Sequence, residues 1–116
     1  MQEELDFKEE LHERAIQNTI LDFIRKNDRI LYGGFAMHLL VIKHSHGKQK
    51  IYDKGLQDVE AYSPTPFEDL VSLANLLSAK NYPNIQVKEA AHPMTYSIYV
   101  NYQQFADFSF MPKSVF

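Results

Sequence analysis

Two short stretches decide the fold, Leu31-Tyr32-Gly33-Gly34-Phe35-Ala36 and Asp58-Val59-Glu60. The apolar run that ends at Tyr32 is too short for a helix, so we expect a buried strand that stops at the glycine pair. Phe35–Ile42 is largely apolar and predicts a helix, which completes a glycine element over residues 30–42. Glycine has no β-carbon, and a helix N-terminus offers unpaired N–H groups, so Gly33 and Gly34 are candidate phosphate-binding residues. The alternative for a glycine pair is a tight turn or close helix packing.

The acidic stretch predicts a strand over residues 58–62. Successive side chains on a strand alternate between faces, so Asp58 and Glu60 should point one way and Val59 into the core. Two adjacent carboxylates repel each other unless a cation lies between them, and Mg²⁺ commonly takes one or two carboxylates together with substrate phosphates. A third acid, Asp107, lies within Phe105-Ala106-Asp107-Phe108-Ser109-Phe110, an aromatic strand expected over residues 105–110. The alternative is that these acids simply face water.

The remaining chain supplies further elements of a mixed α/β fold. The patterns predict an N-terminal helix over residues 3–27, a helix from Pro66 to about Lys80, and strands over residues 85–90 and 95–102. Thr65 should be the N-cap of the second helix, with Glu68 completing a capping box. We expect an α/β (α+β) domain over residues 1–116: a mixed sheet of about five strands, helices mainly on one side and the acids on the other.

Composition narrows the functional class. The 116 residues carry a net charge of −3 and no cysteine, which argues against a general nucleic-acid binder, a disulfide framework and a thiolate metal site. No apolar run approaches the roughly 18 residues of a membrane span, so we expect no membrane partner and a cytoplasmic location. A basic loop over residues 43–57 could steer an anionic substrate or simply be solvated. Its His44-Ser45-His46 has no nearby His or Cys to complete a metal site.

The order of these motifs resembles the nucleotidyltransferase superfamily that includes DNA polymerase beta. A larger set of residues resembles more closely the poly(A) polymerase catalytic subunits of large cytoplasmic DNA viruses of poxvirus, asfarvirus and giant-virus type. That set covers residues 30–116 and consists of Ile30-Leu31-Tyr32-Gly33-Gly34 with Ala36, Ile51-Tyr52, Asp58 with Glu60 and Tyr62-Ser63-Pro64, Glu68-Asp69-Leu70, Ala91-His92 with Thr95, and Ala106-Asp107 with Ser109 and Met111-Pro112.

The resemblance implies an enzyme that adds AMP from ATP to an RNA 3′ end and releases pyrophosphate. Asp58, Glu60 and Asp107 would bind Mg²⁺ or Mn²⁺ and serve as catalytic residues, and Gly33 and Gly34 would hold the triphosphate. It also implies a C-terminal nucleotide- and RNA-binding domain, absent here, a possible processivity subunit, and a location in a viral factory or virion. Glu60 departs from the family, which usually has Asp there.

Two other readings stay open. The chain could be a truncated, non-catalytic interaction module of the same fold, or a minimal transferase that acts on a non-RNA acceptor.

Overall fold

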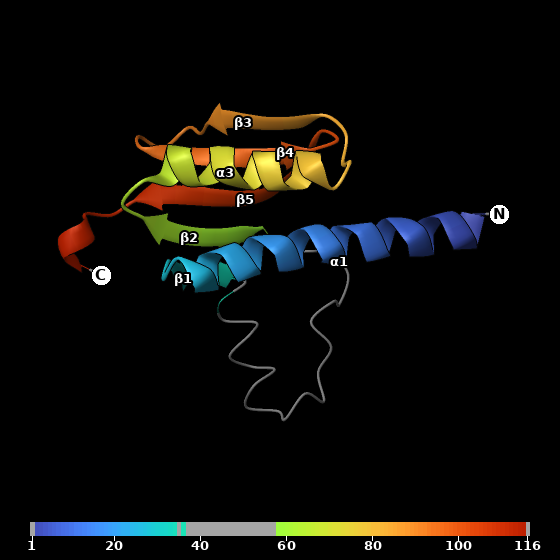
Figure 1. The fold of residues 1–116 in the computed structure, drawn as a ribbon, viewed down its shortest axis with the longest axis horizontal. Helices are drawn as coiled ribbons and strands as arrows, with labels where there is room; N and C mark the ends of the chain where they lie inside the picture. The colour runs from blue at the N-terminus through green and yellow to red at the C-terminus, as the bar shows by residue number, and fades with distance from the viewer. Residues whose placement is uncertain (1, 35, 37–57, 116) are drawn as a thin grey trace, which may run out of the picture.

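A computed structural model of the 116-residue chain describes residues 2–34, 36 and 58–115. Figure 1 shows its elements, in chain order α1 (Gln2–Lys26), β1 (Ile30–Tyr32), β2 (Val59–Ser63), α3 (Pro66–Ala79), β3 (Ile85–Glu89), β4 (Thr95–Val100), β5 (Gln103–Phe110) and a short 3-10 helix (Lys113–Val115). The elements predicted in these residues are all present, with ends that differ by a few residues.

The strands form one five-stranded sheet in the order β1-β2-β5-β4-β3. β2 and β5 run parallel, and the other three pairs are antiparallel. The predicted mixed sheet is therefore confirmed. The order also brings the two acidic strands, far apart in the sequence, side by side in the sheet.

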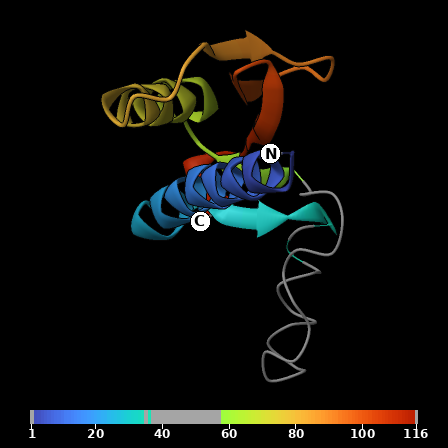
Figure 2. The same ribbon diagram turned by 90° about the vertical axis from the view of Figure 1, so that its right-hand side faces the viewer.

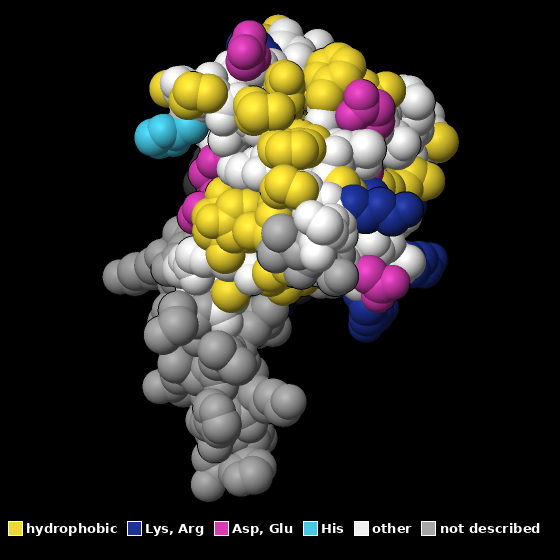
Figure 3. All heavy atoms as spheres, turned by 90° about the vertical axis from the view of Figure 1, so that its left-hand side faces the viewer, with side chains coloured by type: hydrophobic (Ala, Val, Ile, Leu, Met, Phe, Trp, Pro, Cys, Tyr) yellow, Lys and Arg dark blue, Asp and Glu magenta, His cyan; other side chains and the backbone are white. Residues whose placement is uncertain are grey.

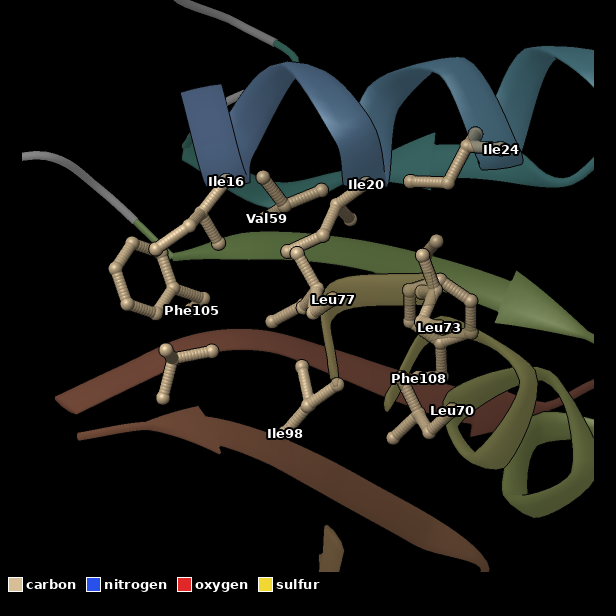
Figure 4. Packing of buried hydrophobic residues seen from close by; sticks show 13 residues of the cluster. Ile16, Ile20, Ile24, Val59, Leu70, Leu73, Leu77, Ile98, Phe105 and Phe108 are labelled. Carbon is tan, nitrogen blue, oxygen red and sulfur yellow. The ribbon is translucent and has the colours of Figure 1, made fainter. Parts of the chain in front are cut away.

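Both helices pack on the same face of the sheet (Figures 1 and 2). The core lies between the two layers, where side chains from α1 and α3 meet those of the central strands (Figure 4). Its buried members are Ile16, Ile20, Ile24, Val59, Ala61, Leu70, Leu73, Leu77, Ile98, Val100, Phe105, Ala106 and Phe108. The helices thus hide one face of the sheet, and within the described residues no helix packs on the other.

Helix α1 is positioned by one apolar stripe. Ile16, Ile20 and Ile24 recur every fourth residue and are almost fully buried, as expected for one face of a helix. Ala15, which the sequence places among the apolar positions, is exposed because it lies beside that stripe. The helix ends before Asp28, whose φ of 56° turns the chain toward β1.

The start of α3 corrects the predicted capping box. Thr65 is the N-cap and Pro66 begins the helix, but no side-chain capping hydrogen bond forms. The Thr65 hydroxyl instead donates to the carboxylate of Asp69, a buried residue. Arg29 donates two hydrogen bonds to that carboxylate, from Nε to Oδ2 at 2.7 Å and from Nη2 to Oδ1 at 3.0 Å. The ion pair between Arg29 and Asp69 therefore joins the segment after α1 to the first turn of α3.

The β4–β5 hairpin turns earlier than predicted. Asn101 and Tyr102 both have positive φ, 49° and 67°, the backbone twist that suits a two-residue hairpin turn. β4 therefore ends at Val100, and Tyr102, expected to lie in the strand, is 73% exposed in the turn. The pairing also shifts between Ile98 and Tyr99.

One end of the molecule carries exposed apolar surface (Figure 3). Phe67, Met94 and Phe110 are 46%, 54% and 39% exposed there, beside a hollow of about 200 Å³ at the start of α3. Phe67 also packs edge-on against Tyr96, with ring centroids 5.4 Å apart. Neither α1 nor α3 covers these apolar side chains at this end of the molecule.

Part of the predicted organisation lies outside the described residues. The helix expected over Phe35–Ile42 is described only at Ala36, which is helical, as are Gly33 and Gly34. The loop over residues 43–57, with its lysines and with His44 and His46, is not described. No helix in the described part of the chain is long and apolar enough to cross a membrane.

Candidate active site

Glu60 and Asp107 lie next to each other on the open face of the sheet. They are Cα partners in the parallel pair of β2 and β5. Their neighbours Val59, Ala61, Ala106 and Phe108 are fully buried against the helices, so the two acids point to the opposite face, as predicted from strand alternation. The parallel pairing thus joins two acids that are 47 residues apart by numbering.

Asp58 belongs to the same cluster. It directly precedes β2, two residues before Glu60, and is half-buried. Burial, followed by the negative charges of Asp107 and Glu60, raises the pKa of Asp58 above its ordinary value. The three acids predicted from the sequence are therefore close enough to feel one another's charge, which is the electrostatic situation that a bound cation relieves.

The carboxylates nevertheless do not converge on one point. Among the described residues, no group of three or more His, Cys, Asp or Glu side chains is arranged to hold a metal ion. The Glu60 carboxylate lies against Gly33, on the β1 side. Asp107 turns the other way, toward β4, and accepts hydrogen bonds from Ser97 of β4 and from Gln104 of its own strand, β5. Two like charges turned apart are what repulsion between them favours.

The donor set still fits a divalent cation in its chemistry. Three carboxylates on neighbouring positions of one face supply hard oxygen ligands, which Mg²⁺ and Mn²⁺ prefer. Burial is the main cause of the raised pKa of Asp58, and a cation would offset the further rise that the charges of Asp107 and Glu60 cause. The residues present therefore suit the metal that the resemblance implies, although their side chains do not already form its coordination sphere.

Gly33 has a role that the sequence did not reveal. Its φ of +81° is a conformation that other residues rarely adopt, and a β-carbon there would lie 2.7 Å from Oε1 of Glu60. The missing side chain thus makes room for an acid of the site. Gly33 and Gly34 are both exposed, so their backbone is accessible beside Glu60.

Hydroxyl groups on the open face were also missed by sequence reasoning. The Tyr32 ring stacks on Tyr62 with centroids 4.1 Å apart, and its hydroxyl lies 3.0 Å from the Ser109 oxygen. The Ser109 oxygen in turn lies 2.9 Å from the Thr95 hydroxyl, within hydrogen-bond distance. The pKa of Tyr32 is raised above its ordinary value. Burial is the main cause and the charge of Glu60 adds to it, while the hydrogen bond with Ser109 partly opposes the rise.

Comparison with known proteins gives a consistent set of relatives. Residues 18–116 match the family model described as poly(A) polymerase catalytic subunit. A protein of that name from Acanthamoeba polyphaga mimivirus is 46% identical over 104 residues, which are 89% of this chain and 18% of the relative. One from African swine fever virus is 33% identical over 103 residues, 88% of this chain and 21% of the relative.

A solved structure agrees with the sequence matches. The crystal structure of the Megavirus polyadenylate synthase superposes with a TM-score of 0.75 at 40% identity, and the match covers 89% of this chain and 21% of that one. The chain therefore spans about a fifth of the length of these relatives.

Proposed function

The chain belongs to the poly(A) polymerase catalytic subunit family, and from this premise we propose that it forms the catalytic core of a metal-dependent nucleotidyltransferase. The reaction would transfer AMP from ATP to the 3′ end of an RNA and release pyrophosphate. One observation carries the proposal. Asp58, Glu60 and Asp107 lie on one face of the sheet, where burial, and then the charges of Asp107 and Glu60, raise the pKa of Asp58.

The acids would act as ligands for Mg²⁺ or Mn²⁺. Such a cation, when bound, would supply charge stabilisation to the oxygens of the phosphoryl group that is transferred. Asp58 and Glu60 would hold the triphosphate through the metal, and Asp107 would lie on the side of the incoming RNA hydroxyl. The backbone of Gly33 and Gly34, exposed beside Glu60, would contact the β- and γ-phosphates.

The chemical step is a single displacement. The RNA 3′ oxygen forms a bond to the α-phosphorus of ATP while the bond from that phosphorus to the bridging oxygen breaks. Pyrophosphate leaves, and the hydroxyl proton passes to Asp107. No covalent bond to the protein is required, so the chain needs carboxylates that position and neutralise charge rather than a nucleophile.

RNA extension tests this proposal. The chain is incubated with Mn²⁺, ATP and a labelled RNA primer, and both primer length and pyrophosphate are measured. We expect extension that disappears in Asp107→Asn and with a matched primer that ends in a 3′-deoxynucleotide. Extension that survives in Asp107→Asn would contradict the assignment of the site.

A second candidate is a non-catalytic module of the same fold. It is favoured by the absence of a three-ligand arrangement in the described residues. It predicts that the chain extends no acceptor, even where ATP and Mn²⁺ bind. Primer extension by the chain alone would rule it out.

A further inference from the structure

Asp107 receives two hydrogen bonds on the same oxygen. The Ser97 hydroxyl and the Gln104 amide both donate to Oδ1, the latter at 2.6 Å. Within the described part of the chain, no donor reaches Oδ2. One oxygen of this carboxylate is therefore held by the protein, and the other remains available on the open face.

A bulge in β5 places Gln104 where it can do this. Residues three apart on a regular strand face opposite sides of the sheet, so Gln104 and Asp107 should not meet. The pairing, however, runs from Ile98 opposite Ala106 to Tyr99 opposite Gln104, which leaves Phe105 as an extra residue. Phe105 and Ala106 are both buried in the core. The bulge thereby turns Gln104 to the face of the acids, as bulges near active sites often do.

Neighbouring groups fix the orientation of both donors. The Tyr99 hydroxyl donates to Oε1 of Gln104 at 3.5 Å, a weak contact that favours the amide orientation with Nε2 toward Asp107. Ser97 lies directly opposite Asp107 on β4 and is 3% exposed, so its hydroxyl has little freedom to leave the carboxylate for water. The two donors approach Asp107 from different strands and so restrict its rotation.

We propose that Ser97 and Gln104 are positioning residues that hold Oδ1 of Asp107 so that Oδ2 is presented to the divalent cation. Ligating carboxylates are themselves commonly hydrogen-bonded, and loss of such an outer partner typically weakens metal binding about 10–100-fold. The inference rests on the proposed function and deepens it, because it assigns to two neutral side chains the orientation of one ligand.

The test uses the Mn²⁺ concentration that gives half-maximal ATP binding by the chain, measured by calorimetry at a fixed ATP concentration. Gln104→Met keeps the length of the side chain without its donor, and Ser97→Ala removes the hydroxyl. We expect each substitution to raise the half-maximal Mn²⁺ concentration about 10–100-fold. Gln103→Met, at the exposed preceding residue, is the matched control and should behave as the unsubstituted chain.

The midpoint of thermal unfolding without metal separates positioning from a structural role. A structural role would lower that midpoint and leave the Mn²⁺ dependence unchanged, which would overturn the inference. If one variant fails to fold, the other carries the measurement. If the unsubstituted chain binds ATP with Mn²⁺ and the variants have the same half-maximal Mn²⁺ concentration, the inference is wrong and the proposed function stands. An unsubstituted chain with no Mn²⁺-dependent ATP binding would remove both.

Discussion

The carboxylate of Glu60 occupies the space where a side chain at Gly33 would lie. A β-carbon built on Gly33 would be 2.7 Å from Oε1 and 2.8 Å from Cδ of Glu60, closer than real contacts allow. Gly33 also has a φ of +81°. The glycine is therefore required twice, by its own backbone and by the acid beside it.

Gly33→Ala should destabilise the chain for both reasons. The left-handed backbone alone costs about 1–3 kcal/mol for a residue with a side chain, and displacement of the Glu60 carboxylate adds to that cost. Urea unfolding would measure the loss. Glu60→Asp shortens the acid by one methylene, so the double variant should lose less stability than the sum of the two single variants. Strict additivity would show that the Glu60 contact is unimportant.

The pH dependence of stability should reveal the crowding of the acids. The folded-state pKa of Asp58 is raised above its ordinary value of 3.8, chiefly by burial and then by Asp107 and Glu60. Between 3.8 and the raised pKa the folded state binds more protons, so the contribution of Asp58 to stability falls as pH rises through that window. Metal-free Asp58→Asn should therefore be more stable than the unsubstituted chain at pH 7.

The same pair of proteins supplies the check. The difference in unfolding free energy between them should shrink as pH falls through the raised pKa and vanish well below 3.8, where Asp58 is neutral in both states. Chemical denaturation across this range in a chelating buffer would measure it. An Asp58→Asn variant that is less stable at neutral pH, with a gap that narrows in acid, would reverse the sign and contradict the account.

Arg29 should be a major stabilising residue although it lies outside the site. Its guanidinium pairs with Asp69, with side chains 17% and 7% exposed. Removal of one partner from a buried pair leaves an uncompensated charge and costs about 3–5 kcal/mol, which is the loss expected for Arg29→Met in urea unfolding. Arg25→Met is the control, because Arg25 and its partner Asp22 are 78% and 55% exposed. That loss should stay below about 1 kcal/mol, and equal losses would refute the distinction.

Local patterns were sufficient for the sheet and its acids. The four-residue spacing of Ile16, Ile20 and Ile24 placed α1, and strand alternation placed Asp58 and Glu60 on the face opposite Val59. Those inferences need only the periods of a helix and a strand, together with which residues prefer burial. The grouping of Asp107 with Asp58 and Glu60 followed from the resemblance, and the pairing of β2 with β5 was not predicted, since no local pattern reports which strands pair.

Contacts that depend on register or on distant partners were not predictable in this way. Ser97 meets Asp107 because the hairpin turns at Asn101 and Tyr102, whereas the alternation of the strand suggested that it continued through Tyr102. Gln104 joins them only through the extra residue Phe105. Asp69 pairs with Arg29, which is 40 residues away in the sequence, and no local pattern reports such a partner. Each of these contacts depends on tertiary packing between residues that local sequence patterns do not relate.

The most direct test of the central claim, that the three acids hold metal against a nucleotide triphosphate, is a calorimetric titration of ATP into the chain with Mn²⁺. The same titration is run with Asp58→Asn and with Mn²⁺ replaced by a chelator. We predict binding that requires the metal and is lost in the variant. Equal ATP binding by the chain and by Asp58→Asn would contradict the claim, because it would place the nucleotide somewhere other than beside these acids.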